Sequence, residues 1–303
     1  MPQTLLPDWI DRYLVTDRQF EAAFAGVSLQ QKSKLKKCIA SLHAWYGQAR
    51  IRANLAQTDH RQGLQAVSIQ KPREWTLIRL DPDAASPALV LATVLPLVLA
   101  GVREVIVCKD QAGTPFPAAL LAALELSGLE TVLDCPGQAA QELCEELSTV
   151  SSCGAVVSLS ESGQAVTGAS QRLRAGGNIP EYALTGPATG GLWIDDPAQW
   201  DFESLQFAHP NLKMRLWSEN AWSLPVSWPQ TQGSLEDLKQ EGYDVLFLPE
   251  ERCNTAAGWA PLILGPGQEG SFVWPGFCLE ICYSTHVAWT DAPHQENSVV
   301  ESR

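Results

Sequence analysis

The sequence predicts an α/β fold with two lobes, each built on a doubly wound, mostly parallel sheet. Between Trp75 and Leu147, short apolar strand-like segments alternate with apolar helix-like segments. Parallel strands need crossovers of a dozen or more residues, and these helices are long enough to supply them. The length of 303 residues suits two lobes at roughly 100–200 residues per domain.

The N-terminal segment 8–58 is predicted to be helical, because apolar residues recur there at helical spacing. The recurring residues are Phe20, Ala23, Phe24, Val27, Leu29, Leu35, Ile39, Leu42 and Trp45. Residues 59–74 are polar and contain Gly63 and Pro72, which is typical of a linker. One basic cluster, which we interpret as the solvated face of a helix, consists of Lys32, Lys34, Lys36 and Lys37.

The alternating segments follow. The predicted strands are 76–80, 104–108, 130–134 and 155–159, and the predicted helices are 86–101, 116–128, 138–149 and 164–175. Ser86 and Pro87 suit the N-cap and the first position of the first of these helices. Glycine and proline in 174–180 mark the end of the lobe.

Beyond this point, tryptophan becomes frequent. The strand candidates are 192–194, 212–217, 244–249 and 278–284. A helix is predicted over 234–242, because Ser234 and Asp237 resemble a capping box and Gly242 suits a helix end. The polar tail from Thr290 is predicted to be disordered.

The composition limits the partners. The net charge of −13 repels phosphate backbones and anionic lipid, so nucleic acid and membrane are not expected as partners. The longest apolar stretch, Pro87–Ala100, is shorter than the roughly 20 residues of a membrane span. The chain opens without the pattern of a signal peptide, and its eight cysteines are loosely spaced. We therefore expect a cytoplasmic protein with free thiols.

Several segments carry a resemblance to a known family, and they are 99–108, 121–143, 162–173, 185–196 and 201–210. They resemble histidinol dehydrogenase, within the wider aldehyde-dehydrogenase-like fold. The resemblance implies binding of NAD and zinc, oxidation of an amino alcohol through an aldehyde to a carboxylate, and a homodimer. The division it implies is 1–60 (N-terminal helices packing on the second lobe), 61–185 (a Rossmann-like lobe), 186–289 (a second α/β lobe) and 290–303 (a disordered tail).

The same resemblance assigns candidate site residues. Gln138 and Gln164 match positions that contact NAD; the alternative is a helix cap and a solvent-facing turn residue. Gln206 and His209 match two zinc ligands, and residues three apart on a helix share a face. The alternative for His209 is an ordinary histidine at a helix end.

The sequence also departs from the family. Asp81-Pro82-Asp83 stands where the family has a glycine turn, and carboxylates before a helix N-terminus repel phosphate. Region 249–267 lacks the family's aspartate ligand, the chain ends too soon for its C-terminal histidine ligand, and no Pro-Glu-His segment is present. A catalytic zinc normally has three protein ligands.

Three weaker features remain. Residues 278–286 are predicted to form a strand with Cys278, Cys282 and His286 on one face, enough for a two-ligand half-site at most. Cys253 is the expected exposed thiol, although Glu250 and Glu251 beside it raise a thiol pKa. Two interpretations are open for a set of large aromatic residues: a ligand platform, or packing in the core and a dimer interface. The residues are Trp193, Trp217, Trp222, Trp228, Trp259 and Trp274.

Three functional hypotheses follow. The first is a divergent histidinol-dehydrogenase-like protein that has lost the dehydrogenase chemistry and binds a nucleotide, another small molecule or a protein partner. The second is an active NAD-dependent dehydrogenase, with a metal at Gln206 and His209. The third is a thiol-dependent aldehyde or acyl-CoA reductase. We favour the first, because a base and two metal ligands are missing and the turn at 81–83 opposes phosphate binding.

Overall fold

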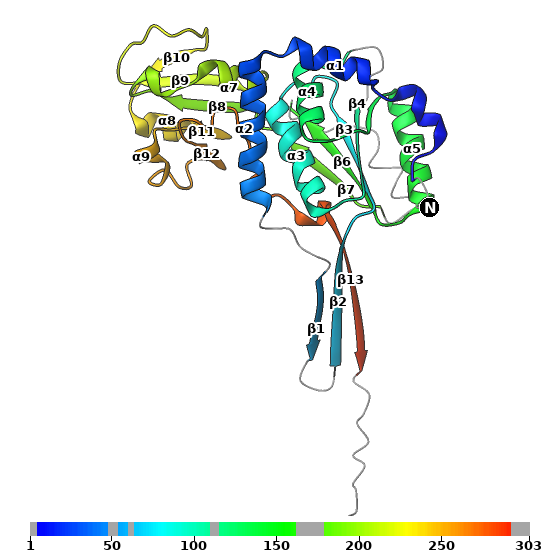
Figure 1. The fold of residues 1–303 in the computed structure, drawn as a ribbon. Helices are drawn as coiled ribbons and strands as arrows, with labels where there is room; N and C mark the ends of the chain where they lie inside the picture. Colours follow the sequence, from blue (N-terminus) through cyan, green and yellow to red (C-terminus); the bar gives the residue numbers. More distant parts are fainter. Residues whose placement is uncertain (1–4, 48–53, 60–63, 110–114, 162–178, 292–303) are drawn as a thin grey trace, which may run out of the picture.

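The computed structural model describes residues 5–47, 54–59, 64–109, 115–161 and 179–291. These residues form two five-stranded sheets and one three-stranded sheet (Figure 1). Every strand pair within the two five-stranded sheets is parallel, and the three-stranded sheet is antiparallel. The predicted fold class, α/β with two mostly parallel sheets, is therefore confirmed.

The first sheet has the strand order β5-β4-β3-β6-β7. Its strands are β3 (Trp75–Leu80), β4 (Glu104–Lys109), β5 (Val132–Asp134), β6 (Gly154–Ser160) and β7 (Glu181–Thr185). All of β3 is buried, as expected for a central parallel strand with both faces covered. The four strands predicted here are confirmed, and β7 was missed.

Helices cover both faces of this sheet. They are α3 (Pro87–Ala100) and α4 (Ala118–Leu126) on one face and α5 (Gly137–Val150) on the other (Figure 1). The predicted helices 86–101, 116–128 and 138–149 are confirmed, whereas 164–175 lies outside the described residues.

The first of these helices begins and ends as the sequence predicts. The Ser86 hydroxyl accepts a hydrogen bond from the Leu89 amide at 3.2 Å, Pro87 is the first helical residue, and Gly101 ends the helix at φ +84°. All of α3 except Val98 and Leu99 is buried. Among the described helices, none combines the length and the apolar character needed to cross a membrane.

The N-terminal segment forms η1 (Asp8–Tyr13), α1 (Asp17–Gly26) and α2 (Leu29–Tyr46), which confirms its helical prediction up to Tyr46. Helix α1 packs on α4, and α2 packs on α3 while also reaching α7 (Phe202–Ala208) of the second lobe. Helix α2 therefore bridges the two lobes.

An arm of three strands was not predicted. It consists of β1 (Asn54–Asp59), β2 (Leu64–Pro72) and β13 (Tyr283–Asp291), and it projects from the body of the molecule (Figure 1). The helix prediction for 54–58 is thus wrong, and so is the linker prediction for Asp59 and 64–72, whereas 60–63 lie outside the described residues. The strand predicted from Cys278 begins only at Tyr283, because Leu279–Ile281 form a 3-10 turn, η4.

The second sheet has the strand order β10-β9-β8-β11-β12. Its strands are β8 (Thr189–Trp193), β9 (Lys213–Ser218), β10 (Gln230–Gln232), β11 (Val245–Phe247) and β12 (Leu262–Leu264). Its helical segments are η3 (Pro197–Gln199), α7 (Phe202–Ala208), α8 (Leu235–Glu241) and α9 (Glu250–Cys253).

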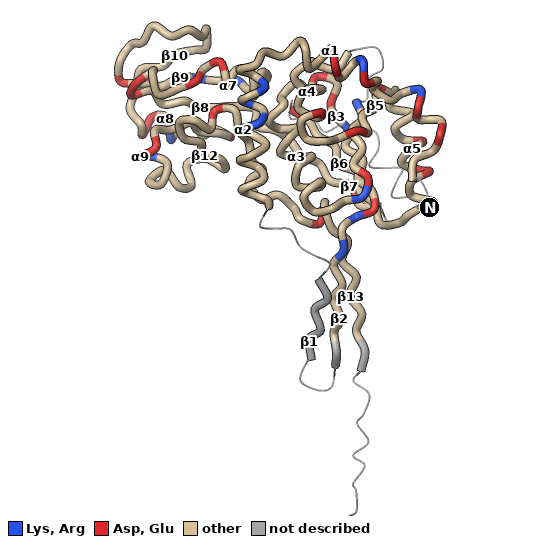
Figure 2. Tube along the Cα trace, viewed as in Figure 1, with Lys and Arg blue, Asp and Glu red and all other residues tan. Residues whose placement is uncertain are grey.

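Most of the elements predicted for the second lobe are present in the structure. Strands at 192–194, 212–217 and 244–249 are confirmed, and β10 and β12 were missed. Ser234 and Asp237 form a complete capping box on α8. Trp193, Trp217 and Trp274 are buried, in agreement with the core alternative. Acidic positions are spread over both lobes with basic ones among them (Figure 2).

Candidate functional site

The first candidate site lies at the carboxyl ends of β3 and β6. The chain proceeds from β3 to β4 and β5 on one side, and β6 and β7 lie on the other, so the strand order reverses between β3 and β6. Open parallel sheets bind ligands at such a point, and a helix N-terminus beside it, here that of α3, favours phosphate.

In this protein a carboxylate of the chain occupies that position. Glu161 directly follows β6, and its Oε1 accepts hydrogen bonds from the amides of Ala85 at 2.9 Å and Ser86 at 2.7 Å. Its Oε2 accepts a hydrogen bond from Nδ2 of Asn211, in the second lobe, at 2.8 Å. The backbone donors before α3 that could hold a phosphate oxygen are therefore bonded to Glu161.

The charge of this carboxylate is only partly compensated. Burial raises the pKa of Glu161, the hydrogen bonds from Ser86, Ala85 and Asn211 oppose the shift, and nearby Asp81 adds to it. Asp81 itself accepts a hydrogen bond from the Ser160 hydroxyl at 3.0 Å. The acidic groups at this strand edge would repel an added phosphate.

Little space remains beside Glu161. The cavity there measures about 10 Å³, the volume of roughly one water molecule. It is lined by Ser86, Leu89, Glu161, Pro187, His209, Asn211 and Leu212. The sequence indicated that the turn at 81–83 opposes phosphate, but it did not single out Glu161, whose only signal was its place directly after a buried strand.

The two glutamines predicted to contact NAD can be placed only in part. Gln138 lies exposed in the first turn of α5, where its side-chain amide donates a hydrogen bond to Glu142 Oε1 at 3.3 Å. Gln164 lies outside the described residues. Neither residue belongs to the lining of the cavity at Glu161.

The two predicted zinc ligands lie in different environments. Gln206 is exposed on α7, whereas His209 is 5% exposed, with its ring packed between Phe247 and Phe272 at centroid distances of 6.4 and 6.2 Å. Burial lowers the pKa of His209 to about 4, although backbone groups of Ser271 and Glu269 oppose the shift. The imidazole is therefore neutral at pH 7.

A zinc ion does not fit these residues. The ring of His209 lies near backbone groups of Ser271 and Glu269, but among the described residues neither ring nitrogen has a partner in hydrogen-bond geometry. No group of three or more His, Cys, Asp or Glu side chains in the described ranges could hold a metal. The two-ligand half-site at Cys278, Cys282 and His286 stays a prediction, because this finding concerns groups of three or more ligands.

The environment of Cys253 does not favour nucleophilic attack. Cys253 was expected to be exposed but is half-buried, and Cys278 is the exposed cysteine. Burial, and then the charge of Glu250, raise the pKa of Cys253, as the sequence predicts for the effect of its acidic neighbours. A raised pKa lowers the thiolate fraction at pH 7.

A second candidate site lies at the carboxyl edge of the second sheet. A cavity of about 410 Å³ opens between α2, the segment after β8 and the loop after β12. Its lining consists of Gln30, Ser33, Lys34, Lys37, Ala198, Gln199, Trp200, Asp201, Ser204, Gly267, Glu269, Gly270 and Ser271. This is the edge at which parallel sheets place their ligands, and here the space is open.

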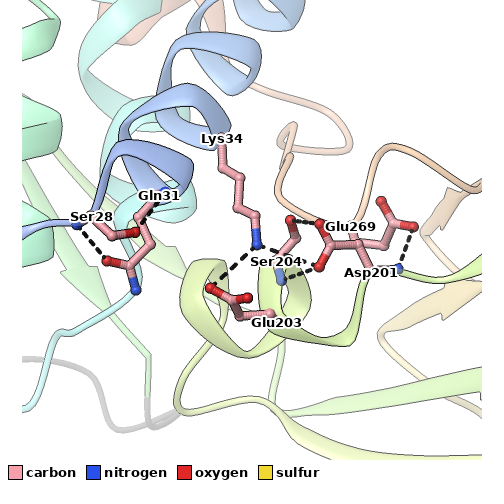
Figure 3. A network of polar contacts seen from close by, with 7 residues as sticks. All are labelled: Ser28, Gln31, Lys34, Asp201, Glu203, Ser204 and Glu269. Carbon is pink, nitrogen blue, oxygen red and sulfur yellow. Dashed lines mark hydrogen bonds and ion pairs between the residues drawn. The ribbon is translucent and has the colours of Figure 1, made fainter. Parts of the chain in front are cut away.

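A network of charged groups borders this cavity (Figure 3). Lys34 Nζ lies 3.4 Å from Asp201 Oδ1 and 3.7 Å from Glu203 Oε1. Partial burial raises the pKa of Asp201, but hydrogen bonds from Ser204 and the charge of Lys34 outweigh it, so the pKa is lowered. The interpretation of the lysine cluster as a solvated face is wrong for Lys34, whose side chain is 12% exposed.

Comparison with known proteins identifies the fold. No protein-family model and no curated protein matches the sequence. The structure is similar to histidinol dehydrogenase from Elizabethkingia anophelis, with a TM-score of 0.58 and 15% identity over 92% of this chain and 77% of that one.

Two other solved structures are similar at 10% identity. A proline utilization A structure with proline bound has a TM-score of 0.50 and covers 89% of this chain and 40% of its own. Succinate-semialdehyde dehydrogenase from Burkholderia pseudomallei has a TM-score of 0.47, with coverages of 90% and 84%.

At these identities the similarity shows the fold alone. The chain has a divergent form of the fold of histidinol dehydrogenase, as its sequence resemblance predicts. A putative aldehyde dehydrogenase from Anabaena variabilis shares this fold, with a TM-score of 0.52 and 10% identity over 93% of this chain and 86% of that one.

Proposed function

We propose that this protein uses a histidinol- and aldehyde-dehydrogenase-like scaffold to bind a ligand or partner, without the NAD-dependent oxidation associated with that fold. The observation that carries the proposal is the position of Glu161. Its carboxylate accepts hydrogen bonds from the amides of Ala85 and Ser86, directly before α3. A dinucleotide would have to displace a buried carboxylate and place its own negative charge beside Asp81.

The other groups support the same proposal. Gln206 is exposed and His209 is buried, which disfavours the shared zinc site that the family resemblance implies. Cys253 has a raised pKa, which opposes thiol catalysis at neutral pH. The open cavity of about 410 Å³ in the second lobe gives a binding protein a place for a small molecule.

Calorimetric titration with NAD, NADP and ADP tests this function, together with metal analysis of the purified protein. We expect no saturable heat with any of the three nucleotides and no stoichiometric zinc. Micromolar binding of NAD that ADP competes for, with reduction of NAD by an alcohol, would overturn the proposal. His209→Ala serves as a control, because it should change neither result if no metal is bound there.

We also infer that the chain forms a homodimer through its arm. In the order β1-β2-β13, no described strand pairs with the outer edge of β1 or of β13. On β13, Val287 and Trp289 are 59% and 66% exposed and, being two residues apart, lie on one face. A projecting sheet with free edges and exposed apolar side chains is suited to pairing with a second copy.

A further inference from the structure

The cavity at the carboxyl edge of the second sheet contains charged groups of both signs. Lys34 and Lys37 come from α2, Asp201 follows β8, and Glu269 follows β12. The four formal charges sum to zero, so the lining favours neither a strong anion nor a strong cation. Which of these groups can meet a ligand depends on the bonds they already make.

Two of the four are engaged with each other. Asp201 accepts hydrogen bonds from the Ser204 amide at 2.9 Å and the Ser204 hydroxyl at 2.6 Å. Lys34 Nζ lies 3.4 Å from the same carboxylate. This pair, with Ser204, holds α2 against the start of α7 (Figure 3). We therefore assign it a structural role.

Glu269 offers one of its two carboxylate oxygens to a ligand. It is 3% exposed, and its Oε1 accepts a hydrogen bond from the Asp201 amide at 3.2 Å. Its second carboxylate oxygen has no hydrogen bond from the described residues and points away from the Asp201 amide (Figure 3). A buried carboxylate favours a cationic or hydrogen-donating partner at its remaining oxygen.

Lys37 is the complementary group. It is exposed, and no described residue forms a hydrogen bond or ion pair with it. Its Nζ lies over Gly267, where an added Cβ would approach it to 3.3 Å. Gly267 has φ +82°, a conformation that favours glycine, so the loop leaves room for this ammonium group at the cavity.

We propose that this cavity binds a small zwitterion, a free amino acid, whose ammonium group contacts Glu269 and whose carboxylate contacts Lys37. A volume of about 410 Å³ is near the lower end of the range for small-molecule sites, roughly 300–1,000 Å³. The ligand restores the charge balance of both unpaired groups, which a diamine, a dicarboxylate or a neutral sugar cannot do. This inference rests on the proposed binding function and names its ligand class.

Thermal-shift measurements on the full chain, with each standard L-amino acid as the probe, test the inference. Succinate, putrescine and glucose are the comparison ligands. One or a few amino acids should raise the Tm by roughly 2–5 °C at saturation, because a ligand bound to the native state stabilises it by mass action. The comparison ligands should leave the Tm unchanged.

Matched variants locate the site. Lys37→Gln and Glu269→Gln should each weaken binding at least tenfold. Lys36→Gln and Glu219→Gln should keep the native affinity, since both control residues are exposed and neither lines the cavity. Glu269→Gln retains an oxygen that can accept the Asp201 amide, so folding should be preserved.

Three outcomes would overturn the inference: no amino acid shifts the Tm, a comparison ligand shifts it instead, or the shift survives in Lys37→Gln and Glu269→Gln. NAD measured in the same assay reports separately on the proposed function. A rise in Tm with NAD would contradict the proposed function, and the amino-acid result could still be interpreted independently.

Discussion

Replacement of Glu161 by alanine should destabilise the protein, because this carboxylate is the acceptor for three donors at the junction of the two lobes. The change removes the hydrogen bonds from Ala85, Ser86 and Asn211 at 2.9, 2.7 and 2.8 Å. Asn211 is exposed and can turn to water. The amide of Ser86 is buried and has no other acceptor among the bonds of the described residues.

The size of this destabilisation follows from the two backbone donors, the amides of Ala85 and Ser86. An unsatisfied buried donor costs about 1–3 kcal/mol, which applies in full to the Ser86 amide, while the half-buried Ala85 amide costs less, so the two together account for about 2–5 kcal/mol. Two effects reduce this figure: the variant no longer buries a carboxylate whose pKa is raised by burial, and water can enter the small cavity. We expect a net loss of about 2–4 kcal/mol in the free energy of unfolding, or roughly 2–4 °C in Tm for each kcal/mol.

Urea denaturation at pH 7 measures this loss. Asp83→Ala is the matched control, because Asp83 is exposed and its side chain forms no hydrogen bond with the described residues. The control should change the stability by less than about 0.5 kcal/mol. If Glu161→Ala costs no more than the control, the carboxylate does not anchor α3 and the reasoning is refuted.

Three further predictions concern other parts of the molecule. Burial lowers the pKa of His209 from 6.5 to about 4, so the unfolded chain takes up a proton at this residue at a higher pH than the native protein does. The free energy of unfolding should therefore fall by roughly 3 kcal/mol as the pH falls from 6.5 to 4. In unfolding titrations, His209→Leu should lose less stability than the native protein between pH 6.5 and 4. A variant with the same pH profile as the native protein would contradict this prediction. Trp289→Glu should convert a dimer to a monomer in light scattering while Trp45→Glu, also exposed, does not; a monomeric native protein rules out the arm interface. Cys278 should give the fastest reaction with a thiol reagent, since it is the exposed cysteine, and persistence of that phase in Cys278→Ser would disprove the assignment.

The sequence predicts the first lobe well because its signals are local. The apolar run at 76–80, the Ser86-Pro87 start of a helix and the next apolar run each specify an element that the core then buries. The capping box of Ser234 and Asp237 works in the same way. Such elements can be predicted from neighbouring residues alone, without reference to distant segments.

The arm could not be predicted on this basis. Gly63 and Pro72 suggested a linker, but Pro72 is the last residue of β2 and pairs with Tyr283, far away in the sequence. The strands of the arm project from the body, so apolar patterning towards a core is weak there.

Both candidate sites also depend on distant contacts. In the sequence, Glu161 is an ordinary acidic residue after a strand. Its role at the start of α3 becomes visible only through its hydrogen bonds with the amides of Ala85 and Ser86. Likewise, the sequence placed Lys34 on a solvated helix face, and only the approach of Asp201 and Glu203 shows that it borders a cavity.

A crystal structure determined with excess ADP tests the central claim most directly, since it shows the Glu161 carboxylate and the two amides together. We predict that Oε1 of Glu161 remains within hydrogen-bond distance of the Ala85 and Ser86 amides, with no nucleotide density at the ends of β3 and β6. A diphosphate bound to those amides, with Glu161 turned away, would contradict the account.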